Sequence, residues 1–176
     1  MNATKQQIQQ SEEATHTICV LVDNEPGVLA RVIGLFSGRG YNIESLTVAE
    51  TDANQGRSRI TIVTTGTLMV IEQIKNQLAR LVPVHTVSDL TIEGPHVERE
   101  LALVKVKNEG EKRVEALRIA DIFRARAVDS TGESFVFEIT GKTGKIDAFI
   151  ELMQPLGLID VSRTGVAAIA RGTEAL

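Results

Sequence analysis

The sequence predicts an α+β protein of two tandem units, each with the order strand, helix, strand, strand, helix, strand. Apolar residues alternate along several short segments and recur every three or four positions along others, which are the periods of strands and helices. The tripeptide Glu93-Gly94-Pro95 has the composition of a linker and divides the 176 residues into two parts of similar length. Both parts show the same order of elements with different residues.

The first half begins with a Gln-rich stretch, Met1 to Thr15, which predicts a disordered extension. From Ile18 to Val22 a continuous apolar run predicts a central strand that is covered on both faces. Apolar residues at 28–36 then recur at helical spacing, with Pro26 expected in the first turn and Gly40 expected to be left-handed after the helix ends. The remaining elements are strands at 43–50 and 59–65, a helix at 68–81 and a strand at 84–92.

The second half repeats this order with a strand at 101–106, a helix at 111–123, a hairpin at 127–130 and 135–140, a helix around 146–153 and a strand at 158–162, followed by an extra strand at 166–170. Two split β-α-β units in tandem predict two ferredoxin-like βαββαβ domains, at residues 16–93 and 96–173. Right-handed crossovers place the strands of the first sheet in the order 2-3-1-4, with strand 43–50 at an edge.

The composition excludes several classes of protein. Lys and Arg number 19 against 23 Asp and Glu, a net charge of −4, and aromatic residues make up 3%, which argues against nucleic-acid binding. The single cysteine, Cys19, excludes a disulfide framework and a cysteine-based zinc site. No apolar run approaches the roughly 18 residues of a membrane span, and the polar N-terminus lacks a secretion signal. These features predict a cytoplasmic protein with no membrane partner.

The residue types used in catalysis and metal binding form no recognisable constellation. The three histidines are not spaced with each other, with Cys19 or with carboxylates as metal ligands are. Gly141-Lys142-Thr143 lies between a strand and a helix, but a phosphate loop needs another glycine where Val136 stands. Thr143 is therefore expected to cap the helix that follows. We predict no catalytic residue and no metal site.

One segment favours ligand binding, the junction from Asp23 to Ala30. A strand ends here and a helix starts at once, so free N–H groups at the helix start can hold an anion such as a carboxylate. Gly27 allows a ligand to approach the backbone, and Asn24 can orient polar groups. On spacing alone, an ordinary strand-to-helix turn capped by Asn24 explains the same residues.

A second feature is a stripe of small residues on the helix surface, Ala30, Gly34 and Ser37 or Gly38, on the same side as the edge strand at 43–50. An open edge strand exposes unpaired backbone groups, and pairing across a two-fold axis removes that exposure. We therefore expect a homodimer through this side.

The segment NEPGVLARVIGLFSGRGYNIESLTV, residues 24–48, closely resembles the first domain of the acetolactate synthase (acetohydroxyacid synthase) small subunit, which belongs to the ACT family of amino-acid-sensing domains. The segments HVERELALVKV at 96–106 and GKTGKIDAFIELMQPLGLIDVSRTGVAAIARG at 141–172 resemble the C-terminal domain of the same subunit. The resemblance covers about residues 16–172.

The resemblance implies a regulatory subunit without catalytic residues. Small subunits of this family associate with a separate large catalytic subunit of the branched-chain amino acid pathway, raise its activity and confer feedback inhibition by valine or another branched-chain amino acid. Thiamine diphosphate, Mg and FAD are expected only in that catalytic subunit. The implied partners are a second copy of this chain, the large subunit and valine.

In the family, the amino acid binds between two ACT domains that pair side by side. Carried over to this sequence, the helix start would hold the carboxylate and the amino group of the ligand. The turn that enters the edge strand of the partner chain would complete the pocket. The implied valine site consists of Asn24, Gly27, Val28 and Leu29 from one chain and Asn42 and Ile43 from the other.

Three other functions stay open. An ACT module that serves another enzyme or regulator would share the first-half motif. A small ferredoxin-like hydrolase such as an acylphosphatase needs a phosphate cradle with an arginine directly after the first strand, whereas Arg31 lies one turn inside the helix. An RNA-recognition module needs aromatic residues on its central strands, and those of the first unit carry none.

Overall fold

A computed structural model describes residues 12–52, 54–173 and 176 of the chain, which divides into two units. The first unit comprises Met1–Val97 together with Ala168–Leu176, and the second comprises Glu98–Ala167. The extension expected over Met1–Thr15 lies outside the described residues up to position 11. Its last part, Ala14 and Thr15, already belongs to the first strand.

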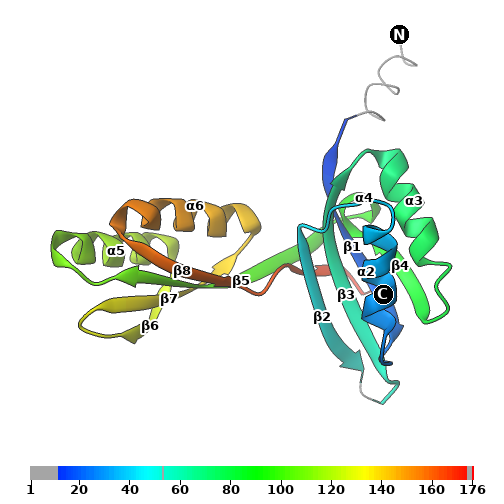
Figure 1. Cartoon of the computed structure of the whole chain (residues 1–176), viewed down its shortest axis with the longest axis horizontal. Helices are drawn as coiled ribbons and strands as arrows, with labels where there is room; N and C mark the ends of the chain where they lie inside the picture. The colour runs from blue at the N-terminus through cyan, green and yellow to red at the C-terminus, as the bar shows by residue number, and fades with distance from the viewer. Residues whose placement is uncertain (1–11, 53, 174–175) are drawn as a thin grey trace, which may run out of the picture. The chain divides into compact units, whose positions relative to one another are not determined.

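The first unit is a four-stranded antiparallel sheet with two helices packed on one face (Figure 1). Its elements are β1 (Ala14–Asp23), α2 (Val28–Ser37), β2 (Ser45–Asp52), β3 (Arg57–Gly66), α3 (Leu68–Leu78), β4 (Val84–Asp89) and the short helix α4 (Leu90–Glu93). The strand order β2-β3-β1-β4 is the predicted one and places β2 at an edge. The βαββαβ prediction for this half is confirmed.

The central strand β1 is buried on both faces, as its continuous apolar run predicts. Ile18, Val20 and Val22 point toward α2 and α3 and are at most 2% exposed. Cys19 and Leu21 point toward the opposite face of the sheet and are 0% and 8% exposed. The sheet therefore has a second covering layer on the side away from the helices.

A segment from the C-terminal part of the chain covers that side. Cys19 Sγ lies 3.9 Å from the carbonyl oxygen of Ala168, which is itself buried. The Arg171 N–H donates a hydrogen bond to the Pro95 carbonyl oxygen at 2.9 Å. The described part of this segment, residues 168–173 and 176, thus packs with the first unit, whereas the sequence predicts that residues up to 173 belong to the second domain.

Two element boundaries differ from the prediction for local reasons. β4 ends at Asp89 and not at position 92, because the Asp89 carboxylate accepts a hydrogen bond from the Thr91 N–H at 3.0 Å and starts α4. Pro26 precedes α2 instead of lying in its first turn, since the N-cap is Gly27 with φ 86°. Gly40 takes the expected left-handed conformation with φ 71°, after the helix ends at Ser37.

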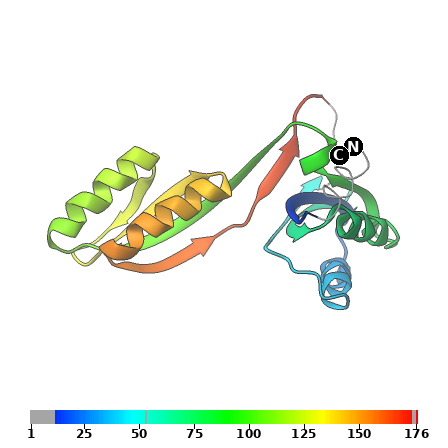
Figure 2. The same cartoon turned by 90° about the horizontal axis from the view of Figure 1, so that it is seen from above.

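The second unit repeats the architecture. Its elements are β5 (His96–Lys107), which enters the unit at Glu98, α5 (Gly110–Phe123), β6 (Arg126–Ser130), β7 (Ser134–Gly141), α6 (Thr143–Met153), a 3-10 turn η1 (Gln154–Leu156) and β8 (Leu158–Arg163). The last strand, β9 (Ala167–Ala170), belongs to the first unit from Ala168 onward. The strands follow the order β6-β7-β5-β8, and β9 pairs with β5 as the predicted extra strand. Figure 2 shows α5 and α6 side by side over one face of this sheet.

Aromatic side chains fill the core of the second unit. The ring centroids of Phe135 and Phe137 lie 5.6 Å apart, and those of Phe137 and Phe149 lie 6.2 Å apart. All three side chains are at most 3% exposed. In the described parts of the chain, no helix is long and apolar enough to cross a membrane.

A buried carboxylate at the edge of this core is paired with an arginine. Glu100 is 5% exposed, and both of its oxygens accept hydrogen bonds at 2.7 Å from the guanidinium of Arg163 on the neighbouring strand. The same guanidinium donates to Asp147 on α6 at 2.7 Å. The arginine therefore ties β5, β8 and α6 together.

We expect Arg163→Met to lower the free energy of unfolding by about 1–3 kcal/mol, because the buried Glu100 carboxylate loses its donors. Arg126→Met is the matched control, since Arg126 pairs with Glu138 at the surface and exposed ion pairs contribute little. Urea unfolding followed by circular dichroism measures both. An equal loss of unfolding free energy in the two variants would contradict the stabilising role of Arg163 as partner of the buried Glu100 carboxylate.

Candidate functional site

The start of α2 is held in place by backbone hydrogen bonds from two neighbouring turns. The Asp23 N–H donates to the Pro83 carbonyl oxygen at 2.9 Å, and the Asn24 N–H donates to the Gly56 carbonyl oxygen at 2.7 Å. The chain then reverses through Gly27, whose φ of 86° and ψ of −7° lie in the left-handed region. A residue without Cβ suits this conformation, so the helix begins abruptly at Val28.

The first N–H groups of α2 are open to a ligand. Gly27 offers no side chain to cap them, and the helical hydrogen bonds start with the Arg31 N–H, which donates to the Gly27 carbonyl oxygen at 3.1 Å. Among the described residues, the N–H groups of Leu29 and Ala30 have no acceptor. Unpaired N–H groups at a helix start carry partial positive charge and bind carboxylates or phosphates.

Four residues of the implied valine site lie at this helix start and differ in exposure. Asn24, Gly27 and Leu29 are exposed, with Leu29 at 37%. Val28 is only 4% exposed and packs in the core, so it offers its backbone rather than its side chain. Asn24 is not the helix cap, because Gly27 occupies that position.

Asn42 and Ile43 lie at the other end of the same sheet. They precede β2, where Ser45 pairs with Val63 of β3, whereas Asp23 at the end of β1 pairs with Arg57 of β3. Six residues of β3 separate these two levels, which is about 20 Å along a strand. One chain therefore brings together Asn24, Gly27, Val28 and Leu29, and leaves the other two residues apart from them.

The loop before β2 is fixed to the sheet. The Asn42 carbonyl oxygen accepts a hydrogen bond from Thr64 Oγ1 at 2.6 Å, while its side chain is exposed. Ile43 is half-buried and packs against the core of the first unit. Both residues are thus held in defined positions beside the edge strand.

Two histidine–aspartate pairs are present that the sequence did not predict. His85 Nε2 lies 2.6 Å from an Asp23 oxygen, directly before Asn24 at the helix-start end of the sheet. His16 Nδ1 lies 2.7 Å from an Asp89 oxygen, and both side chains are buried. The partners are more than 60 positions apart in sequence, so only the strand register brings them together.

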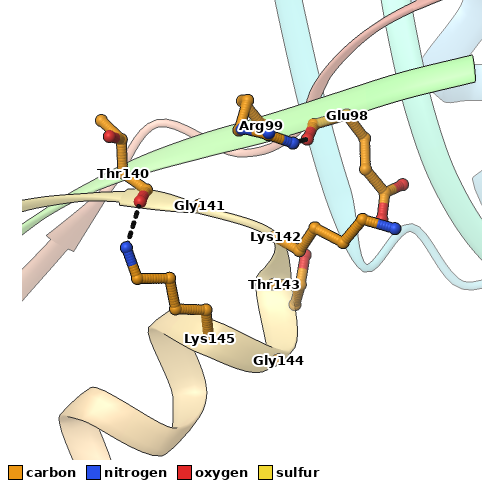
Figure 3. Close-up of a pocket in the computed structure, with 8 residues that line it drawn as sticks. All are labelled: Glu98, Arg99, Thr140, Gly141, Lys142, Thr143, Gly144 and Lys145. Carbon is orange, nitrogen blue, oxygen red and sulfur yellow. Dashed lines mark hydrogen bonds between the residues drawn. The ribbon is translucent and has the colours of Figure 1, made fainter. Parts of the chain in front are cut away.

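The Gly141-Lys142-Thr143 junction forms a shallow hollow of about 650 Å³ in the second unit (Figure 3). Thr143 is not the predicted cap, because α6 has Lys142 at its N-cap and no side chain caps it. Lys145 Nζ donates to the Thr140 carbonyl oxygen at 2.9 Å, as Figure 3 shows. A Cβ on Gly141 would come within 2.6 Å of the Lys145 side chain, so this glycine makes room for that stem.

Comparison with known proteins identifies the family. The model described as the AHAS small subunit-like ACT domain matches residues 18–86, and the model described as the small subunit of acetolactate synthase matches residues 99–172. A probable acetolactate synthase small subunit of Archaeoglobus fulgidus is 49% identical, over 90% of this chain and 98% of its own length. The chain belongs to the acetolactate synthase small-subunit family.

Other relatives agree with this assignment. The small subunit of acetolactate synthase isozyme 3 from Escherichia coli is 47% identical, over 88% of this chain and 94% of its own length. The crystal structure of the acetolactate synthase small subunit from Thermotoga maritima superimposes with a TM-score of 0.82 at 38% identity, covering 92% of this chain and 99% of that one. The match over residues 99–172 separates the chain from ACT modules of other enzymes.

We expect Gly27→Ala to lower the free energy of unfolding by about 1 kcal/mol, because alanine disfavours a φ of 86°. Gly144→Ala is the control, since Gly144 lies in α6 with ordinary helical geometry and open space around it. That change should leave stability equal or slightly higher. Unfolding in urea compares the two, and a loss of equal size in Gly144→Ala would contradict the conformational argument.

Proposed function

We propose that this chain is the regulatory, non-catalytic subunit of an acetolactate synthase in branched-chain amino acid biosynthesis. It binds a thiamine-diphosphate-dependent catalytic subunit, raises the activity of that subunit and transmits inhibition by valine. The observation that carries the proposal is the uncapped start of α2, where Gly27 leaves N–H groups open beside an exposed Asn24. Relatives named as small subunits over nearly the whole chain support it.

A two-fold pairing of β2 edges would bring the two distant residues, Asn42 and Ile43, of one chain to the other four residues of the site on its partner. If two β2 strands pair antiparallel, the start of one strand lies beside the end of the other. Asp52 at the end of β2 and Asp23 at the end of β1 both pair with Arg57. Asn42 and Ile43 of one chain would then approach the helix-start end of the partner's sheet, and the homodimer would contain two equal sites.

The exposed side chains along this edge fit such a pairing. Val48 on β2 is 43% exposed, and on the adjoining surface of α2 the small residues Ala30, Gly34 and Ser37 are exposed. Small residues permit the close approach of a second helix. An apolar edge that is paired is also protected from unspecific association.

The chemistry of the α2 start suits a free amino acid. The carboxylate of valine would accept hydrogen bonds from the N–H groups of Leu29 and Ala30, and the Asn24 side chain would contact its polar end. The exposed Leu29 side chain and the partner's Ile43 would contact the isopropyl group.

Because both chains contribute to each site, valine would stabilise one arrangement of the dimer over another. If the catalytic subunit prefers the other arrangement, a coupling of about 1–3 kcal/mol is sufficient for feedback inhibition. The catalytic residues, thiamine diphosphate, Mg and FAD would belong to the catalytic subunit.

Val48→Lys should convert the dimer to a monomer at micromolar concentration, because the lysine ammonium would be buried at the paired edge. Val82→Lys is the control, as Val82 is 94% exposed and lies away from β2. Light scattering gives the mass of each variant. A monomeric mass for the unchanged chain would refute the dimer.

Gly27→Asp should weaken valine binding at least tenfold, because its carboxylate would stand where that of the ligand binds, and such like-charge contacts cost several kcal/mol. Gly27→Asn is the matched control, having the same size and tolerance of positive φ without the charge. Titration calorimetry measures binding. In the reconstituted complex, Gly27→Asp should still activate acetolactate formation but lose inhibition by valine.

The outcomes separate the parts of the proposal. Valine inhibition retained in Gly27→Asp would refute the site while leaving the subunit assignment intact. Failure of the unchanged chain to raise the activity of a catalytic subunit would refute the regulatory role. Valine binding without any effect on a catalytic subunit would favour an amino-acid sensor that serves another enzyme or regulator.

A further inference from the structure

A cavity of about 590 Å³ lies in the first unit, on the sheet face opposite α2 and α3. Cys19 and Arg59 line its floor, since they alternate with Val20 and Ile60, which point toward the helices. The segment after α4, with His96, and the C-terminal segment, with Ile169 and Arg171, form its other walls. All lining residues belong to the first unit.

The cavity contains cationic groups without anionic partners. Arg59 Nε is buried and has no hydrogen-bond partner, and within the described ranges no carboxylate pairs with the Arg59 guanidinium. Arg171, an exposed residue at the rim, also makes no ion pair in that part of the chain. Buried N–H donors without acceptors are rare in folded proteins because each costs free energy.

The acidic groups of the cavity form no ion pair with these arginines in the described part of the chain. Glu93 accepts hydrogen bonds from the Asp89 N–H at 2.9 Å, from Lys75 Nζ at 3.4 Å and from Ser88 Oγ. Its cationic partner is Lys75, which it shares with Glu72. Burial raises the pKa of the Cys19 thiol, so it stays protonated near neutral pH. The terminal carboxylate of Leu176 also lines the cavity. The feature that distinguishes the lining is therefore the pair of guanidinium groups without ion-pair partners in the described part of the chain, not an excess of positive charge.

We propose that this cavity binds a small molecule through a phosphate group, with Arg59 and Arg171 as the donors. A phosphate monoester carries a charge of about −1.5 to −2 near neutral pH, which matches two unpaired guanidinium groups. The planar fork of arginine fits phosphate oxygens in a bidentate manner. The volume lies within the range of about 300–1,000 Å³ that is typical of small-molecule sites.

The proposal is independent of valine sensing, because the two sites occupy opposite faces of the sheet. Glycine and backbone N–H groups make the start of α2, whereas arginine side chains make this cavity. Variants of one site are thus expected to leave ligand binding at the other unchanged.

The test is titration calorimetry on the full chain with pyrophosphate as probe, at constant ionic strength, with citrate as a carboxylate anion for comparison. Pyrophosphate should bind saturably to one site per chain and more tightly than citrate. Arg59→Met, which keeps the aliphatic stem, and Arg171→Met should each weaken binding about tenfold or more. Arg80→Met removes an exposed arginine in the turn that follows α3 and should change affinity less than twofold.

Circular dichroism and valine titration of each variant check that the first unit is folded. If Arg59→Met does not fold, Arg171→Met provides the test. No saturable binding of pyrophosphate to the unchanged chain would overturn the proposal. Equal weakening by Arg80→Met would overturn it as well, since binding would then follow net charge. Citrate binding as tight as that of pyrophosphate would overturn the phosphate assignment.

Discussion

The burial of β1 on both faces is the constraint on which the first unit depends. One set of alternating side chains on this strand packs under α2 and α3, and the other set, including Cys19 and Leu21, needs a cover on the far face. The strand pairs along its whole length with β3 and along its second half with β4, so its end at Asp23 is fixed. That fixed end determines where α2 begins. The position of the proposed amino-acid site thus follows from the packing of a strand that contributes no side chain to it.

The elements could be predicted from the sequence because they depend on local periodicity. The apolar run from Ile18 to Val22, the helical spacing after Gly27 and the crossover rule together gave the strand order β2-β3-β1-β4, and the structure agrees. Side-chain capping was less predictable. The Asp89 carboxylate ends β4 and starts α4 by accepting one hydrogen bond from the Thr91 N–H, and this bond depends on a side-chain rotamer, not on a pattern of apolar residues.

Contacts between residues that lie far apart in the chain could not be predicted from the sequence. Asp23 and His85, or His16 and Asp89, meet only through strand register, and nothing in their spacing indicates it. The cover of Cys19 by Ala168 has the same origin, with 149 positions between the two residues. For the candidate site, the helix start could be predicted from Gly27 and its neighbours. That Asn42 and Ile43 lie at the other end of the sheet became known only from the pairing of β1 and β2 with β3.

The division of the first unit between two distant parts of the chain bears on how the protein folds during synthesis. The ribosome makes β1 to α4 early, but the segment that covers Cys19 follows the complete second unit. Until then, the far face of the first sheet is exposed to solvent and to other nascent chains. Contacts of such long range form slowly, and exposed apolar strands at that stage favour aggregation. The second unit, whose residues are contiguous, is complete before the first unit receives its final strand.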